Sequence, residues 1–390
     1  MNINEKSLKL HEQWKGKIEI TSKVPVKTMS DISTVYKSGA EEPCRAINKN
    51  IDEVYKYTAK GNMVAIVTDG TAVLGLGDIG PEASLPVMEG KAVLFKEFGR
   101  VDAFPICIAS KDVKDIVHTI KMIAPGFGGI NLEDISSPRC VEIERQLKKE
   151  LNIPVFHDDR HGTAVVVVAG LMNALKVVGK KWEDLDVAIS GAGAAGSAIV
   201  KMLNVVGVKE IIVCNRTGIL NRNEKYSNWV HQEIAETTNF GRISGGLNEA
   251  LIGADVFIGV SAPNLLTEEM IGRMADNAIV FSMANPEPEI LPSVAKRGGA
   301  RIVGTGRSDY ENQINNILAF PGIFRGALDA KASDINEAMK LAAARAIAGL
   351  ISEEELKEEY IIVPAFDDRV GAAVSEAVYN AAIASGVSRL

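Results

Sequence analysis

Two pairs of adjacent acidic residues each follow a short apolar stretch of the sequence. Glu133 and Asp134 come after GGINL, and Asp158 and Asp159 come after IPVF. Both stretches are typical of strands joined by one helix, so we expect parallel neighbours whose carboxyl ends share one sheet edge. Clustered carboxylates repel one another unless a cation neutralises them, and oxygen ligands suit Mg²⁺ or Mn²⁺. The alternative is that these acids are helix caps and solvated turn residues.

Two histidines flank the second acidic pair in the segment FHDDRHGT. His157 and His161 are four residues apart, a spacing that places two side chains together only on a helix. We expect Asp158 and Asp159 to lie in a strand-to-helix turn, with the helix beginning at residues 162–163. The histidines are therefore not expected to bind the metal.

A glycine-rich hexapeptide, GAGAAG, lies between the apolar stretch DVAIS and a helical pattern. The G-x-G-x-x-G spacing carries weight only in this strand–turn–helix context, where backbone N–H groups at the helix start can bind pyrophosphate. The sequence therefore predicts a dinucleotide site. The expected contacts are Gly191, Gly193, Ala194, Ala195 and Gly196.

The choice between NAD and NADP depends on the end of the next strand. An acidic residue about 20 residues after the motif would accept a hydrogen bond from the ribose 2′-hydroxyl and repel a 2′-phosphate. Asn215 occupies that position, and Arg216 follows it. Arg216 could neutralise a phosphate, stack on adenine or lie in solvent, so both nucleotides remain open.

The order of apolar and amphipathic stretches predicts an α/β fold with two domains. We expect an N-terminal α/β substrate and metal domain over residues 1–160, then a Rossmann-type doubly wound parallel sheet for NAD(P) over 161–340. Residues 341–390 are expected to form C-terminal helices that pack back toward the N-terminal domain. The apolar run 163–179 contains Asn173 and Lys176 and is short for a membrane span, which favours a buried helix.

Composition excludes several classes of function. The 390-residue chain has a formal net charge of −7, which argues against nucleic-acid binding because no basic surplus neutralises phosphates. Its four cysteines are widely spaced, as in reduced proteins, and the N-terminal segment lacks the apolar core of a secretory signal. We expect a cytoplasmic protein with no membrane or nucleic-acid partner.

Longer segments resemble the short bacterial form of malic enzyme. These are TDGTAVLGLGDIGPEASLPVMEGKAVLFKEFGRVDAFPICI, NLEDI, FHDDRHGTAVVVVAG, GAGAAG, FSMANPEPE and GRSDYENQINNILAFPGIFRGAL, with DISTVYKSGAEEPC similar to the family's N-terminal tyrosine motif. The resemblance implies oxidative decarboxylation of L-malate to pyruvate and CO₂ through oxaloacetate, with NAD or NADP and Mg²⁺ or Mn²⁺. It also implies a homodimer or higher homo-oligomer, in which Tyr36 or Lys91 could cross a subunit interface.

The resemblance assigns roles to individual residues. The metal ligands correspond to Glu133, Asp134 and Asp159, and Asp158 matches a neighbouring active-site aspartate. The family's lysine and tyrosine correspond to Lys91 and Tyr36, and its substrate or cofactor asparagines to Asn285 and Asn316.

The chain departs from the family pattern at three places. Tyr36 is followed by Lys37, Ser38 and Gly39 instead of threonine, proline and glycine. Arg160 stands where glutamine or isoleucine is usual. Ala72 occupies the position of the carboxylate-binding arginine of long eukaryotic members, so the partner of the malate carboxylate is unassigned.

Malate oxidation at C2 needs a base for the hydroxyl proton, and protonation of enolpyruvate at C3 needs an acid. We expect Lys91 as the base, with its pKa lowered by burial or by the metal, and Tyr36 as the acid. Lys91 and Tyr36 could act as a coupled pair. The alternatives are another two-domain NAD(P)-dependent dehydrogenase, a malolactic enzyme that releases lactate, and a non-catalytic nucleotide sensor.

Overall fold

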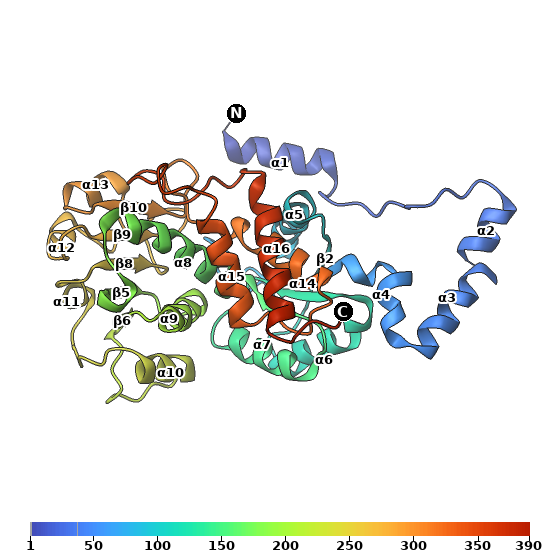
Figure 1. The fold of residues 1–390 in the computed structure, drawn as a ribbon, viewed down its shortest axis with the longest axis horizontal. Helices are drawn as coiled ribbons and strands as arrows, with labels where there is room; N and C mark the ends of the chain where they lie inside the picture. Colours follow the sequence, from blue (N-terminus) through green and yellow to red (C-terminus); the bar gives the residue numbers. More distant parts are fainter. Residues whose placement is uncertain (1, 37) are drawn as a thin grey trace.

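A computed structural model describes residues 2–36 and 38–390, so Lys37 of the tyrosine motif lies outside it. The chain forms two mainly parallel sheets joined by one long helix (Figure 1). The α/β class and the two-sheet architecture predicted from the sequence are confirmed. The division at residues 160 and 340 stays a prediction.

The first sheet has the strand order β2-β1-β3-β4, with every pair parallel. Its strands are β1 (Met63–Thr68), β2 (Asp102–Cys107), β3 (Gly129–Leu132) and β4 (Val155–His157). The crossover helices are α5 (Pro81–Gly99), α6 (Val113–Ile123) and α7 (Arg139–Glu150). Because β3 and β4 pair in parallel, the two acidic pairs do emerge on one edge, as predicted.

The second sheet has the order β10-β9-β8-β5-β6-β7, a doubly wound arrangement around β5. The strands are β5 (Asp186–Ser190), β6 (Glu210–Asn215), β7 (Gly218–Ile219), β8 (Val256–Gly259), β9 (Ile279–Ser282) and β10 (Ile302–Thr305). Helices around it are α9 (Ala194–Val206), α10 (Trp229–Thr237), α11 (Leu247–Ala250), α12 (Glu268–Ile271) and α13 (Pro292–Arg297). The two-residue β7 pairs antiparallel to β6, and no sequence pattern predicts it.

The long apolar helix α8 (Asp158–Val178) runs between the two sheets (Figure 1). It is long and apolar enough to span a membrane, but 72 % of its most apolar window is buried inside the protein. The prediction of a buried core helix is confirmed.

The C-terminal segment returns to the first sheet. It comprises α14 (Phe320–Asp329), α15 (Glu337–Ala348) and α16 (Arg369–Ala384), which pack on one another, with α14 against α5 and α15 against α8. The ring centroids of Phe95 on α5 and Phe320 on α14 are 4.8 Å apart. A side-chain carbon added at Gly326 would lie 2.4 Å from a backbone oxygen of α16, so glycine there allows close helix packing.

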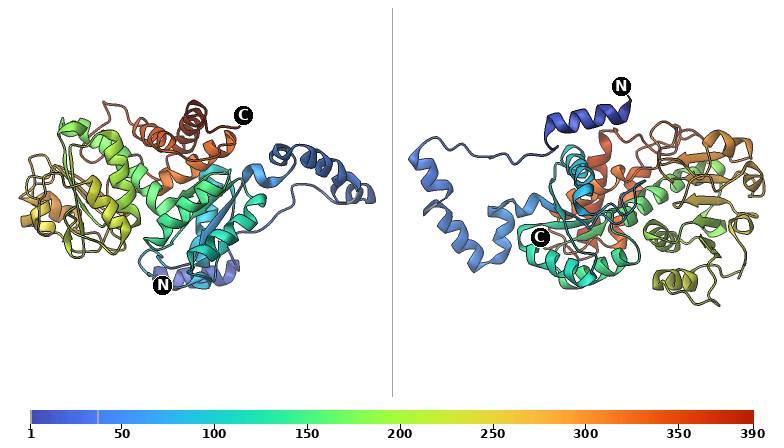
Figure 2. Two further views of the ribbon diagram at one scale, coloured as in Figure 1. Left: turned by 90° about the horizontal axis from the view of Figure 1, so that it is seen from below. Right: turned by 180° about the vertical axis from the view of Figure 1, so that it is seen from behind.

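The N-terminal segment has a different character, because none of its first three helices buries a residue. These helices are α1 (Ile3–Trp14), α2 (Met29–Val35) and α3 (Ser38–Lys49). Figures 1 and 2 show α2 and α3 as an arm that projects away from the body, which the chain rejoins through α4 (Val54–Tyr57).

One helix start differs from the prediction, and another helix lacks a side-chain cap. Helix α8 begins at Asp158, not at residues 162–163, so both aspartates lie in its first turn, where carboxylates complement the helix dipole. Helix α7 begins at Arg139 after Pro138, and the Ser137 hydroxyl makes no capping hydrogen bond.

The aromatic contact between α5 and the C-terminal helices leads to a stability prediction. Phe95→Ala removes a fully buried ring, so we expect a loss of about 3–5 kcal/mol in the free energy of unfolding. Leu85→Ala, on an exposed part of the same helix, is the control and should cost less than about 1 kcal/mol. Urea unfolding followed by circular dichroism measures both, and equal losses would contradict this packing.

Candidate functional site

Four carboxylates and one lysine meet where β3 ends and α8 begins. The ammonium group of Lys91, from the middle of α5, donates to Glu133 at 2.9 Å and to Asp158. The backbone N–H of Asp134 donates to Asp159 at 2.8 Å, which ties the two acidic pairs together. The five side chains expected to lie at one site therefore do so.

Burial disfavours the charged form of all four carboxylates. Burial, with repulsion from Asp159 and Glu133, raises the pKa of Asp134 to about 9. Burial also raises the pKa of Asp158 to about 8 and the pKa of Glu133, although attraction to Lys91 offsets part of each rise. Burial raises the pKa of Asp159 as well. The cluster therefore favours a further positive charge.

Lys91 supplies positive charge to this cluster. It is 8 % exposed, and Nζ lies 3.8 Å from the centroid of the Phe320 ring. Burial alone would lower the pKa of Lys91, but Asp158 and Glu133 together raise it. The expected burial is confirmed, whereas the expected lowering of the pKa is not seen, because two carboxylates hold the ammonium proton.

A divalent cation is compatible with these donors. In residues 2–36 and 38–390, no three His, Cys, Asp or Glu side chains are already arranged as a metal centre. Glu133, Asp134 and Asp159 nevertheless supply only oxygen donors, whose mutual repulsion a cation would relieve. Asp158 Oδ1 is buried and lacks a hydrogen-bond partner.

The two histidines of FHDDRHGT are buried, and their rings have different surroundings. His161 Nε2 contacts Glu144 at 2.7 Å, and Nδ1 contacts the buried Lys340. Both ring nitrogens of the buried His157 lack a hydrogen-bond partner, and Nδ1 lies 3.7 Å from Asp159 Oδ2. Burial lowers the pKa of His157 to about 4 and that of His161 to about 3, so both rings are neutral at pH 7.

One ion pair beside the site was not foreseen from the sequence. Arg139, at the start of α7, donates to Asp69 at 2.7 Å and to Thr71 at 2.8 Å. Thr71 in turn accepts from the backbone of Ser136, two residues after the carboxylates. The pair locks the loop after β1 to the loop after β3, and a separation of 70 residues leaves no local signal for it.

The glycine motif has the geometry that a dinucleotide needs. A side-chain carbon at Gly196 would lie 1.8 Å from the backbone oxygen of Gly191, so only glycine fits the turn. At Gly193 nothing lies within 4 Å, and α9 starts there without a side-chain cap. The open space beside Gly193 can therefore accommodate a pyrophosphate. The backbone N–H groups at the helix start, including those of Ala194 and Ala195, are available to bind it.

The ribose end of this site carries no carboxylate. The side-chain oxygen of Asn215 accepts from the backbone N–H and the hydroxyl of Thr217, both at 2.8 Å. It is thereby occupied in a local turn, and Arg216 beside it is exposed. Nothing in this turn would repel a 2′-phosphate.

The two asparagines of the family motifs occupy different surroundings. Asn316 donates to Asp158 at 2.7 Å and so joins the carboxylate cluster. Asn285 is exposed in the loop after β9 and is not brought to the cluster. The buried Glu289 holds that loop by accepting from Ser282 and from the backbone of Ala284, both at 3.0 Å. The sequence gives no signal for Glu289, because Glu287 in the same Pro-rich segment is exposed.

Tyr36 is not brought to the carboxylate cluster. It ends α2 on the projecting arm with 74 % of its surface exposed. The expected coupling of Tyr36 to Lys91 therefore does not exist within a single chain.

Comparison with known proteins agrees with this arrangement. Residues 15–148 match the malic enzyme N-terminal domain, and residues 161–296 and 299–383 match the malic enzyme NAD binding domain. The chain is 56 % identical to a bifunctional malic/malolactic enzyme of Bacillus subtilis, over 100 % of this chain and 95 % of that protein. It is also 56 % identical to an NAD-dependent malic enzyme of Geobacillus stearothermophilus, over 100 % of this chain and 81 % of that one.

A solved structure of a malic enzyme has a similar fold. The NAD-dependent malic enzyme of Thermotoga maritima superimposes with a TM-score of 0.93 at 48 % identity, over 96 % of this chain and 98 % of that one.

The open space at Gly193 yields a direct prediction. Gly193→Ala should leave the fold intact, since the added carbon meets no protein atom, but should weaken nucleotide binding at least about tenfold by blocking the pyrophosphate. Fluorescence titration with NADH measures the affinity. Gly126→Ala, equally open but remote from the motif, is the control. An unchanged affinity in Gly193→Ala would place the cofactor elsewhere.

Proposed function

The chain belongs to the malic enzyme family, whose reaction is the oxidative decarboxylation of malate with a nicotinamide nucleotide, and we propose how its own residues carry out that reaction. The observation that carries the proposal is the buried Lys91 held between Glu133 and Asp158 at the edge where the two acidic pairs meet. Lys91 accepts the proton of the malate C2 hydroxyl as hydride leaves C2 for the nicotinamide.

Glu133, Asp134 and Asp159 would hold a divalent cation, Mg²⁺ or Mn²⁺. When bound, such an ion supplies the electrophile that stabilises the enolate oxygen formed as CO₂ leaves. If Glu133 held the cation, one of the two carboxylates that keep the Lys91 ammonium protonated would be neutralised, which would lower the lysine pKa and let Lys91 act as a base. Asp158 keeps its contacts with Lys91 and Asn316 and orients both groups.

Tyr36 remains the proposed acid for C3, and we propose that a second copy of the chain delivers it. The arm that carries Tyr36 consists of helices of 7 and 12 residues with no buried side chain. Helices this short are marginal in water without a packing partner. An arm with apolar Met29 and Val35 exposed therefore needs another surface to cover it.

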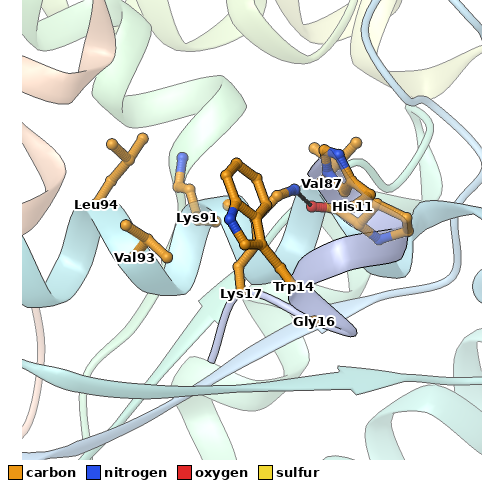
Figure 3. A pocket seen from close by; sticks show the side chains of 10 residues that line it. His11, Trp14, Gly16, Lys17, Val87, Lys91, Val93 and Leu94 are labelled. Carbon is orange, nitrogen blue, oxygen red and sulfur yellow. Dashed lines mark hydrogen bonds between the residues drawn. The ribbon is translucent and has the colours of Figure 1, made fainter. Parts of the chain in front are cut away.

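The same chain offers such a surface. A cavity of about 900 Å³ lies between α1 and α5, and Lys91 lines it. Figure 3 shows His11, Trp14 and Lys17 on the N-terminal side, Val93 and Leu94 beside Lys91, and Val87 beside His11. In a two-fold dimer each arm would cover the other subunit's groove, so that Tyr36 of one copy reaches Lys91 of its partner.

The proposal also covers the nucleotide used and the cellular compartment. The turn at Asn215 lacks an acid, so both NAD and NADP are proposed as cofactors. The four cysteines are free in the structure, as expected of a cytoplasmic enzyme.

Removal of the metal gives the first test. We expect EDTA to abolish malate oxidation and Mn²⁺ or Mg²⁺ to restore it. Asp159→Asn should lose activity by at least about 10²-fold without loss of fold, because it removes a ligand charge. Coupled measurement of pyruvate and reduced nucleotide is the assay. Full turnover in EDTA would remove the metal from the mechanism.

Subunit mixing tests the shared site. Tyr36→Phe and Lys91→Ala should each be nearly inactive on malate. After mixing by unfolding and refolding together, hybrid dimers contain one intact site, so about one quarter of wild-type activity should return if pairing is random. Refolding each variant alone is the control. A mixture with no more activity than the separate variants would show that Tyr36 and Lys91 act within one chain or not together.

A further inference from the structure

A second group of buried charges adjoins the carboxylate cluster but contains none of the residues given a catalytic role. Lys340 of α15 is 1 % exposed and Glu144 of α7 is 2 % exposed. Arg160 and His161, also buried, lie in the first turn of α8. A buried charge is strongly destabilising unless it is paired. The ion pairs and hydrogen bonds among these four side chains therefore constrain the helices that carry them.

The contacts run in a fixed order from Lys340 toward the carboxylates. Lys340 Nζ lies 3.1 Å from His161 Nδ1, and an ammonium can only donate, so Nδ1 accepts and the ring proton lies on Nε2. Nε2 then donates to one oxygen of Glu144 at 2.7 Å, and the other oxygen accepts from Arg160. Arg160 and His161 directly follow Asp159 in the same helical turn.

The contacts also run from Lys340 toward the nucleotide. Lys340 donates to Glu337 at 3.0 Å, and Glu337 pairs with Lys201 at 2.7 Å. Lys201 lies on α9, the helix whose N-terminus is formed by the glycine motif. A continuous series of charged contacts therefore joins the dinucleotide helix to the turn that carries the acidic pair.

We infer that Lys340 is a positioning residue for the metal site, which rests on the cation dependence proposed above. Through His161 and Glu144 it fixes the first turn of α8 and with it Asp159. Through Glu337 it makes the position of that turn sensitive to α9, so nucleotide and cation binding favour each other. Residues that orient ligands in this way typically change metal affinity by about 10–100-fold when removed.

The competing account is that these charges only stabilise the fold, in which case an apolar replacement of Lys340 would change stability but not ligand affinity. Mn²⁺ binding separates the two accounts without any turnover. The dissociation constant is measured by electron paramagnetic resonance of free Mn²⁺, in the presence and absence of saturating NAD⁺, alongside the melting temperature. The variants are Lys340→Met, Lys340→Arg and Glu337→Gln.

We expect wild-type protein to bind Mn²⁺ more tightly with NAD⁺ than without it. Lys340→Met should weaken Mn²⁺ binding about tenfold and remove the effect of NAD⁺, while NAD⁺ binding alone stays within about twofold of wild type. Lys340→Arg should restore part of the affinity. Glu337→Gln should keep the affinity without nucleotide but reduce the effect of NAD⁺.

Arg345→Met is the matched control, because Arg345 is exposed on the same helix and makes no ion pair in residues 2–36 and 38–390. It should behave as wild type. Wild-type Mn²⁺ affinity in Lys340→Met overturns the inference, and so does a parallel loss of NAD⁺ and Mn²⁺ binding. Failure of the wild-type protein to bind Mn²⁺ would instead refute the proposed cation dependence.

Discussion

The ammonium group of Lys91, held between Glu133 and Asp158, is the contact on which the rest of the structure depends. Four carboxylates at one sheet edge cannot all be charged without a compensating cation, and the raised pKa of Asp134 expresses that cost. Lys91 compensates part of it from a helix of the same domain. The proposed proton transfer to Lys91 would therefore change the charge balance that holds the site together.

Much of the fold serves to hold these groups at one point. Parallel pairing of β3 with β4 places both acidic pairs on one edge, and α8 begins at the second pair. The C-terminal helices then return to α5, and Phe320 lies against both Phe95 and the lysine ammonium. Lys91 therefore packs against an aromatic ring of the C-terminal helices, and its burial strengthens its electrostatic interactions with the carboxylates.

The sequence predicts this site well where the chemistry depends on strand order. The apolar stretches before Glu133 and Asp158, with a single crossover between them, were sufficient to place both pairs on one edge. The same holds for GAGAAG, whose strand–turn–helix context decides its geometry. Motif similarity, and not spacing, singled out Lys91 and Asn316, which the structure brings to the carboxylates.

The remaining features depend on contacts between distant segments or, for Tyr36, on the proposed dimer. Arg139 and Asp69, or Lys340 and His161, are far apart in sequence, and no local pattern links them. The start of α8 was misplaced because the aspartates were interpreted as turn residues before the helix, whereas they occupy its first turn. Tyr36 lies exposed at the end of α2, and it would meet Lys91 only in the proposed dimer.

The most direct test of the account is to supply malate with NAD⁺ or NADP⁺, with and without Mn²⁺, and to follow pyruvate and reduced nucleotide in the same sample. The account predicts that both products appear in equal amounts and only when the cation is present. Lactate without reduced nucleotide would indicate a malolactic reaction, and reduced nucleotide without pyruvate or without a cation requirement would contradict the role assigned to Glu133, Asp134 and Asp159.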